Sequence, residues 1–182
     1  MLHSILATVE PWVSPTIDYH ALAPEMVLAG GLCVVLLADL FLDESRKWII
    51  SSLAGFTLLG AMLPVLTLGL DEVAVRQMFD GRYVVDEFSI VMKAMFLIAG
   101  YVVVLLSSKH VEENEYWRGE YWFLLLSSIL GMVMMTSSRD LVSIFVALEF
   151  LSIPAYMLAA WRKRDIKSNE AGMKYFLLGV FA

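Results

Sequence analysis

Long apolar blocks separated by short polar segments dominate this sequence. A helix that crosses a bilayer needs roughly 20 mostly apolar residues. The pattern predicts five such helices and a truncated sixth that is too short to span as it stands. They cover about 22–42, 48–70, 88–107, 121–137, 141–161 and, for the sixth, 168–182. We therefore predict an all-α, polytopic transmembrane helix bundle that forms a single transmembrane domain over residues 1–182.

Composition agrees with a membrane protein and argues against several other classes. The chain is 59% hydrophobic and 18% charged, whereas soluble domains average about 45–50% apolar and about 25% charged residues. Its net charge of −6 offers no basic face to nucleic acid. One cysteine, Cys33, and three separated histidines supply no ligand set for zinc or an iron–sulfur cluster. No glycine-rich phosphate loop is present either, so we expect no cofactor in this chain.

The lysines and arginines of the short polar segments predict an orientation. Such residues accumulate in cytoplasmic loops. With the N-terminus outside, the inner loops hold eight of them: Arg46, Lys47, Lys109, Arg118, Arg162, Lys163, Arg164 and Lys167. The outer loops then hold three: Arg76, Arg82 and Arg139. We predict an outside N-terminus and a multi-pass protein of a bacterial inner (plasma) membrane. The acidic outer loop 71–87 is expected to form a short hairpin around Asp80-Gly81.

One carboxylate interrupts the apolar run IFVALEFLSIP at residues 144–154. Glu149 lies eight residues past Leu141, about 12 Å along a helix and close to the middle of a hydrocarbon core about 30 Å thick. A charged group there is costly unless it is paired or hydrated, so acids at this depth mark routes for ions or protons. We interpret Glu149 as a proton carrier. The alternative is a carboxyl group that only ties two helices together by hydrogen bonds.

Three neighbours of Glu149 support the first interpretation. Ser152 and Tyr156 follow at i+3 and i+7 and would give Glu149 a polar stripe on one helical face. Pro154 cannot donate to the carbonyl of Phe150, so it is expected to free a backbone acceptor beside Glu149 and to kink the helix.

Other charged residues also fall inside the apolar blocks. Lys174 either contributes to a proton path or pairs with Glu170 four residues before it, and both interpretations stay open. Lys93 lies five residues past Phe88 and is expected to extend outward to the membrane surface. Glu25 follows a proline at the start of the first helix, where a structural role is the favoured interpretation.

Several segments resemble a known family. LVSIFVALEFLSIPAYMLAAWRKRDIKSNEAGMKYFLLGVFA is similar to the fifth and sixth helices of the N subunit of proton-pumping NADH:quinone oxidoreductase, respiratory complex I. LAPEMVLAGGLCVVLLADLFL resembles the first helix of that subunit, and VDEFSIVMK resembles the start of its third. The resemblance covers essentially the whole chain, but members of the family continue through many more helices. It therefore implies an N-terminal portion of an antiporter-like subunit.

The resemblance also implies a function. Glu149 matches the family's fifth-helix glutamate, whose lysine partner lies on a seventh helix beyond this sequence, and Lys174 matches a sixth-helix lysine. The chain would help to couple electron transfer from NADH to quinone to proton translocation. It would perform no redox chemistry itself, because NADH, FMN, iron–sulfur clusters and quinone would bind to partner subunits. Its partners would be the other membrane-arm subunits and the lipid bilayer.

Two other functions remain open from the sequence. One is a subunit of a multisubunit sodium/proton antiporter or of a membrane-bound hydrogenase, since both share the glutamate in the middle of a helix. The other is a truncated chain with only a structural or assembly role. Neutralising Glu149 separates this last possibility from a pump, because only a pump would lose proton translocation.

Overall fold

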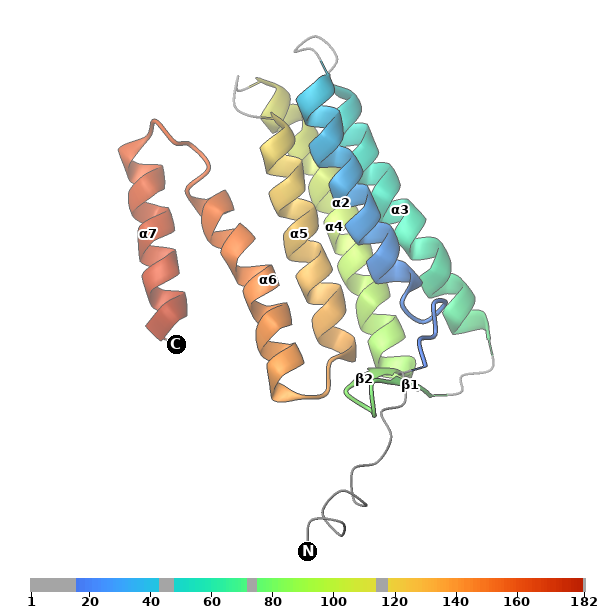
Figure 1. Cartoon of the computed structure of the whole chain (residues 1–182). Helices are drawn as coiled ribbons and strands as arrows, with labels where there is room; N and C mark the ends of the chain where they lie inside the picture. The colour runs from blue at the N-terminus through green and yellow to red at the C-terminus, as the bar shows by residue number, and fades with distance from the viewer. Residues whose placement is uncertain (1–15, 43–47, 72–74, 114–117, 182) are drawn as a thin grey trace, which may run out of the picture.

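The computed structural model describes residues 16–42, 48–71, 75–113 and 118–181, and it is a helix bundle (Figure 1). Its helices are α2 Ala23–Phe41, α3 Trp48–Leu70, α4 Glu87–Glu113, α5 Arg118–Ser137, α6 Leu141–Ala159 and α7 Ile166–Phe181. Among the described residues, five helices, α2 to α6, are long and apolar enough to cross a membrane. The predicted all-α fold with five spanning helices and a sixth is confirmed. The outside N-terminus and the single domain over 1–182 stay predictions.

Four helices form the compact part of the bundle. Side chains from α2, α3, α4 and α5 share one apolar core, which includes Leu28, Leu58, Leu97, Trp122 and Ile129. Figure 1 shows α6 lying on the outer side of α5, with α7 beyond it. Burial decreases in the same direction. In α5, 56% of the apolar spanning segment is buried, whereas in α6 only 11% is buried. Helix α6, which carries Glu149, is therefore much less covered by the rest of the chain than α5.

A small hairpin closes one end of the four-helix core. Strands β1 Arg76–Met78 and β2 Tyr83–Val85 are antiparallel, with Met78 opposite Tyr83. Phe79, Asp80 and Gly81 all have positive φ between the strands, a conformation that asparagine, aspartate and above all glycine tolerate. The predicted hairpin around Asp80-Gly81 is confirmed. We call this side of the molecule the hairpin end.

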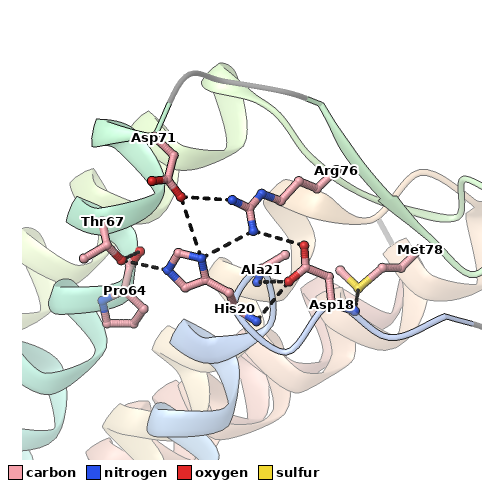
Figure 2. Close-up of polar contacts among 8 residues, drawn as sticks. All are labelled: Asp18, His20, Ala21, Pro64, Thr67, Asp71, Arg76 and Met78. Carbon is pink, nitrogen blue, oxygen red and sulfur yellow. Dashed lines mark hydrogen bonds and ion pairs between the residues drawn. The ribbon is translucent and has the colours of Figure 1, made fainter.

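Ion pairs tie the hairpin to the helices beside it (Figure 2). The Arg76 guanidinium donates to Asp18, just before α2, and to Asp71, just after α3, both at 3.0 Å. Asp18 also accepts hydrogen bonds from the backbone N–H groups of His20 and Ala21. Burial alone would raise the pKa of the Asp18 carboxyl, but the Ala21 hydrogen bond and Arg76 outweigh it and hold that pKa below its ordinary value of 3.8. One arginine thus joins three segments of the chain.

Candidate functional site

Glu149 occupies the middle of α6, as the ninth of its 19 residues. Its side chain is half-buried and lines an apolar hollow of about 430 Å³ between α5 and α6. The residues that line the hollow with it are Phe123, Leu124, Ser127, Phe145, Val146, Phe150, Ile153, Pro154 and Met157. Ser127 is the other polar residue of this lining. The carboxyl group therefore faces an apolar space at mid-helix depth.

Small side chains let α5 and α6 approach closely beside Glu149. A Cβ atom on Gly131 of α5 would meet the backbone of α6, at 2.8 Å from the carbonyl carbon of Phe150 and 2.9 Å from the carbonyl oxygen of Ala147. The Ser128 hydroxyl donates to the carbonyl oxygen of Leu151 at 3.2 Å. Because Pro154 leaves the Phe150 carbonyl without its usual partner, the close contact falls on the weakened turn of α6. Helix α6 nevertheless continues through Pro154, which is buried.

The structure brings only part of the predicted site together. Pro154 lines the hollow with Glu149, whereas Tyr156 turns to α7 and packs edge-on against Tyr175 at 4.8 Å between ring centroids. Ser152 is half-buried and does not line the hollow. Of the three residues predicted to support Glu149, only Pro154 lines the hollow with it.

Lys174 lies on the surface of α7. Its Nζ atom is 2.6 Å from Oε1 of Glu170, and the two side chains are 68% and 57% exposed. This is the ion pair at i−4 that the sequence offered as one of two interpretations. The pair leaves Lys174 directed to its own helix and not to the hollow of Glu149.

The junction before α6 is fixed to the hairpin. Asp140 caps α6 by accepting a hydrogen bond from the backbone N–H of Ser143 at 3.2 Å. The Arg139 backbone N–H donates to the Arg82 carbonyl at 2.8 Å, and the Arg139 guanidinium pairs with Asp86. The residues directly before α6 are thus held both by the Asp140 cap and by the contacts of Arg139 with Arg82 and Asp86.

A buried ion pair that the sequence did not predict lies under the hairpin. The expectation that Lys93 extends to the membrane surface is wrong: its side chain is 0% exposed, and its Nζ atom is 2.7 Å from Oε1 of Glu25. The Tyr83 phenol donates to the same oxygen at 2.6 Å, and Lys93 Nζ lies 3.3 Å from the phenol oxygen. We call Glu25, Tyr83 and Lys93 the Glu25 cluster.

The Glu25 cluster combines three elements that are distant in sequence. Glu25 is the third residue of α2, Lys93 the seventh of α4, and Tyr83 belongs to β2. Burial and the adjacent Glu25 carboxylate raise the pKa of the Tyr83 phenol, so the phenol stays protonated and donates. The available signal in the sequence was two opposite charges near the ends of α2 and α4, but nothing local links Lys93 to Glu25 rather than to water. Among the described residues, no group of three or more His, Cys, Asp or Glu side chains could hold a metal ion.

Comparisons with known proteins assign the chain to a family. Residues 138–182, which contain Glu149 and Lys174, match the family described as NADH:quinone oxidoreductase/Mrp antiporter, TM. NADH-quinone oxidoreductase subunit N of Thioalkalivibrio sulfidiphilus is 34% identical over 165 residues, covering 91% of this chain. Subunit N 2 of Streptomyces griseus is 36% identical over 182 residues, covering 98% of this chain. The chain is a homologue of NADH-quinone oxidoreductase subunit N.

A solved structure agrees with this homology. A chain in the structure of respiratory complex I from Thermus thermophilus with bound aureothin superposes with a TM-score of 0.69 at 30% identity, over 87% of this chain and 33% of that one. The resemblance to the N subunit is therefore confirmed. So is the prediction of a multi-pass protein of the plasma membrane, since the relatives of this subunit N homologue are bacterial.

The subunit N homologue spans about a third of the length of its curated relatives. The share is 34% for both the Thioalkalivibrio and the Streptomyces proteins. This share fits the prediction that the sequence corresponds to one portion of an antiporter-like subunit.

Proposed function

We propose that this chain is a membrane-arm subunit of a proton-translocating NADH:quinone oxidoreductase. In this proposal Glu149 is a proton-carrying carboxylate. The observation that carries the proposal is the position of Glu149 halfway along a spanning helix, against an apolar hollow and inside the segment that matches the family. Homology to subunit N supports the assignment to the complex.

The surroundings of Glu149 suit a group that gains and loses a proton. An unpaired ionised carboxylate at this depth costs several kcal/mol, while a cation brought close to it favours the ionised form. Movement of a cation toward and away from Glu149 would therefore release and rebind a proton. Beside the carboxyl group, Pro154 weakens one turn of α6, and the contact with Gly131 packs that turn tightly against α5. This packing positions the Glu149 carboxyl group without adding a competing charge.

The same proposal divides the chemistry among subunits. Electron transfer from NADH through FMN and iron–sulfur clusters to quinone would take place on partner subunits. This chain would contribute a proton site and contacts with the other membrane-arm subunits and with lipid. Its two exposed helices, α6 and α7, carry apolar side chains such as Phe145, Val146 and Leu178 on their surfaces, as expected for contact with lipid or other membrane segments.

Neutralising Glu149 in the assembled complex tests this proposal. We expect Glu149→Gln and Glu149→Ala to abolish most proton translocation in proteoliposomes, and Glu149→Asp to retain part of it because the carboxyl group is kept. Glu87→Gln is the matched control, since Glu87 is an exposed carboxylate at the start of α4. Equal proton translocation in Glu149→Gln, Glu87→Gln and the unmodified complex, with assembly intact, would refute a pump role and favour a structural one.

Lys174 is a second residue proposed for the proton path, and its ion pair with Glu170 provides the test. An ion pair that serves only α7 predicts the same small effect from Lys174→Gln and Glu170→Gln, because either change breaks it. A role in the path predicts that Lys174→Gln alone lowers the number of protons moved per NADH oxidised.

A subunit of a sodium/proton antiporter is the second candidate function. It is supported by the matching family, whose description includes the Mrp antiporter. This candidate predicts proton movement that depends on a sodium gradient and needs no NADH. The first candidate predicts proton movement driven by NADH oxidation in sodium-free buffer.

A further inference from the structure

The Glu25 cluster holds a carboxylate that is only half satisfied. Oxygen Oε1 of Glu25 receives both Lys93 and Tyr83, whereas Oε2 is buried and has no hydrogen-bond partner among the described residues. Buried carboxylate oxygens are normally hydrogen-bonded, because an unpartnered one keeps its full desolvation penalty. An acceptor in this state indicates a missing donor.

A buried hydroxyl group, that of Ser137, lies beside the same cluster. Ser137, the last residue of α5, is fully buried, and its Oγ atom has no aligned partner among the described residues. It faces the Tyr83 phenol, and its neighbour Ser138 pairs with Tyr83 through a backbone bridge. Buried polar atoms that lack a full set of partners often bind a water molecule, which typically makes about 3 hydrogen bonds.

We propose that Glu25, Tyr83 and Ser137 form a hydrated proton-binding site under the hairpin, separate from Glu149. One water molecule would bridge Oε2 of Glu25 and the Ser137 hydroxyl. The bound proton arrives from a hydronium ion: one of its O–H bonds breaks, an O–H bond forms at Oε2 of Glu25, and water is left. No electrons are transferred.

The contacts around the cluster leave Oε2 as the open acceptor of Glu25. Lys93 and the Tyr83 hydroxyl occupy Oε1, so an incoming proton finds only Oε2 free. Asp86, ahead of α4, is the other carboxylate that acts on Lys93, and it is paired with Arg139. At the same end, Arg76 is held by Asp18 and Asp71. Among the described residues, Lys93 is the cation that pairs with Glu25, and no charged side chain of α3 or α5 forms an ion pair with it.

The hairpin connects this site to the helix of Glu149. Tyr83 in β2 binds Glu25 through its side chain and Ser138 through its backbone. Arg82, its neighbour, accepts from the Arg139 backbone N–H directly before α6. A proton gained at Glu25 weakens the Tyr83 hydrogen bond to that carboxyl and so acts on the strand that fixes the start of α6. Proton binding itself does not depend on the proposed pump role, but any contribution to translocation rests on it.

Infrared difference spectra between acidic and neutral pH test for the bound proton in the assembled complex. The spectrum of the unmodified complex minus that of Glu25→Gln is expected to contain one titrating carboxyl band. Tyr83→Phe and Ser137→Ala are expected to shift that band, because they remove a hydrogen-bond partner while keeping the Glu25–Lys93 ion pair. They also preserve the test if Glu25→Gln fails to assemble. Glu87→Gln, which removes an exposed carboxylate, should leave the band in place.

One outcome would overturn proton binding at Glu25, and a second would overturn its link to translocation. One is the absence of a titrating band assigned to Glu25, with the Tyr83→Phe and Ser137→Ala spectra unchanged. The other concerns translocation. Tyr83→Phe and Ser137→Ala could both move the normal number of protons per NADH oxidised while Glu149→Gln moves fewer. That result would show that the Glu25 site takes no part in pumping, and it would leave the proposed function intact. Failure of the proposed function itself gives a different result, normal proton movement in Glu149→Gln.

Discussion

Lys93 and Glu25 form an ion pair whose Nζ–Oε1 distance is 2.7 Å, and the lysine side chain has no exposed surface. The pair links α4 to α2 under the hairpin. A charged side chain in such a place is tolerated because a carboxylate of opposite charge lies beside it and Tyr83 adds a hydrogen bond to each of the two. The ring of Tyr83 adds a cation–π contact, with Lys93 Nζ 5.4 Å from its centroid.

Removal of one member of this pair should destabilise the chain strongly. We expect Lys93→Ala or Glu25→Ala to lower the free energy of unfolding by about 3–5 kcal/mol, because each leaves a buried charge without its partner. Replacement of both residues by methionine should restore much of the loss, since no charge is then left buried. Unfolding of the purified chain in detergent measures all three variants. A double variant no more stable than the single ones would show that the charges are not the cause.

Acidification should loosen the hairpin through Asp18. The pKa of Asp18 is lower in the folded chain than its ordinary value of 3.8, so folding favours the ionised form. Its contribution is therefore present above pH 3.8 and is lost as pH falls through the folded value. Hydrogen exchange of the Arg76–Met78 and Tyr83–Val85 amides at decreasing pH measures this loss.

Two asparagine variants separate Asp18 from other acids of the hairpin end. Asp18→Asn should exchange faster at neutral pH and should lose this part of the pH dependence. Asp80→Asn changes an exposed residue of the hairpin turn and should behave like the unmodified chain. Identical pH profiles for the two variants would contradict the role of Asp18.

Gly131 should not tolerate a side chain. A Cβ atom there would meet backbone atoms of α6, which cannot rotate away as a side chain can. We expect Gly131→Ala to destabilise the chain by about 1–3 kcal/mol. Gly30→Ala is the control, because nothing lies within 4 Å of its added Cβ and alanine gains up to about 1 kcal/mol over glycine in a helix. A stabilised Gly131→Ala variant would rule out the close α5–α6 contact.

The helices could be predicted from the sequence because bilayer thickness fixes the length of an apolar segment. The third predicted block ends at 107, whereas α4 continues to Glu113. The fourth predicted block begins at 121, whereas α5 begins already at Arg118. Backbone hydrogen bonding continues beyond the membrane into charged residues such as Lys109, which apolarity alone does not detect.

The candidate sites were predictable only in part. Glu149 is visible because a single acid interrupts an apolar run, and that signal is local. The Glu25 cluster is not, because Glu25, Tyr83 and Lys93 meet only after α2, β2 and α4 have packed together. Lys93 alone fits extension to the membrane surface equally well. Pairing between elements is the information that one sequence does not contain.

Asp140 should set the start of α6 and hence the depth of Glu149. Hydrogen bonds from the hydroxyl and the backbone N–H of Ser143 hold the pKa of Asp140 below 3.8, so its charged form is favoured by the folded cap. Asp140→Ala should speed hydrogen exchange at the Ser143 amide and lower proton translocation without affecting assembly. Asp140→Asn keeps a capping oxygen and should retain slow exchange at Ser143 and normal proton translocation. In the unmodified chain, exchange at Ser143 should increase as the pH falls through the pKa of Asp140. Asp140→Asn should not show this increase. If Asp140→Ala matches Asp140→Asn in exchange and translocation, then the hairpin contacts of Arg139, and not the cap, determine where α6 begins.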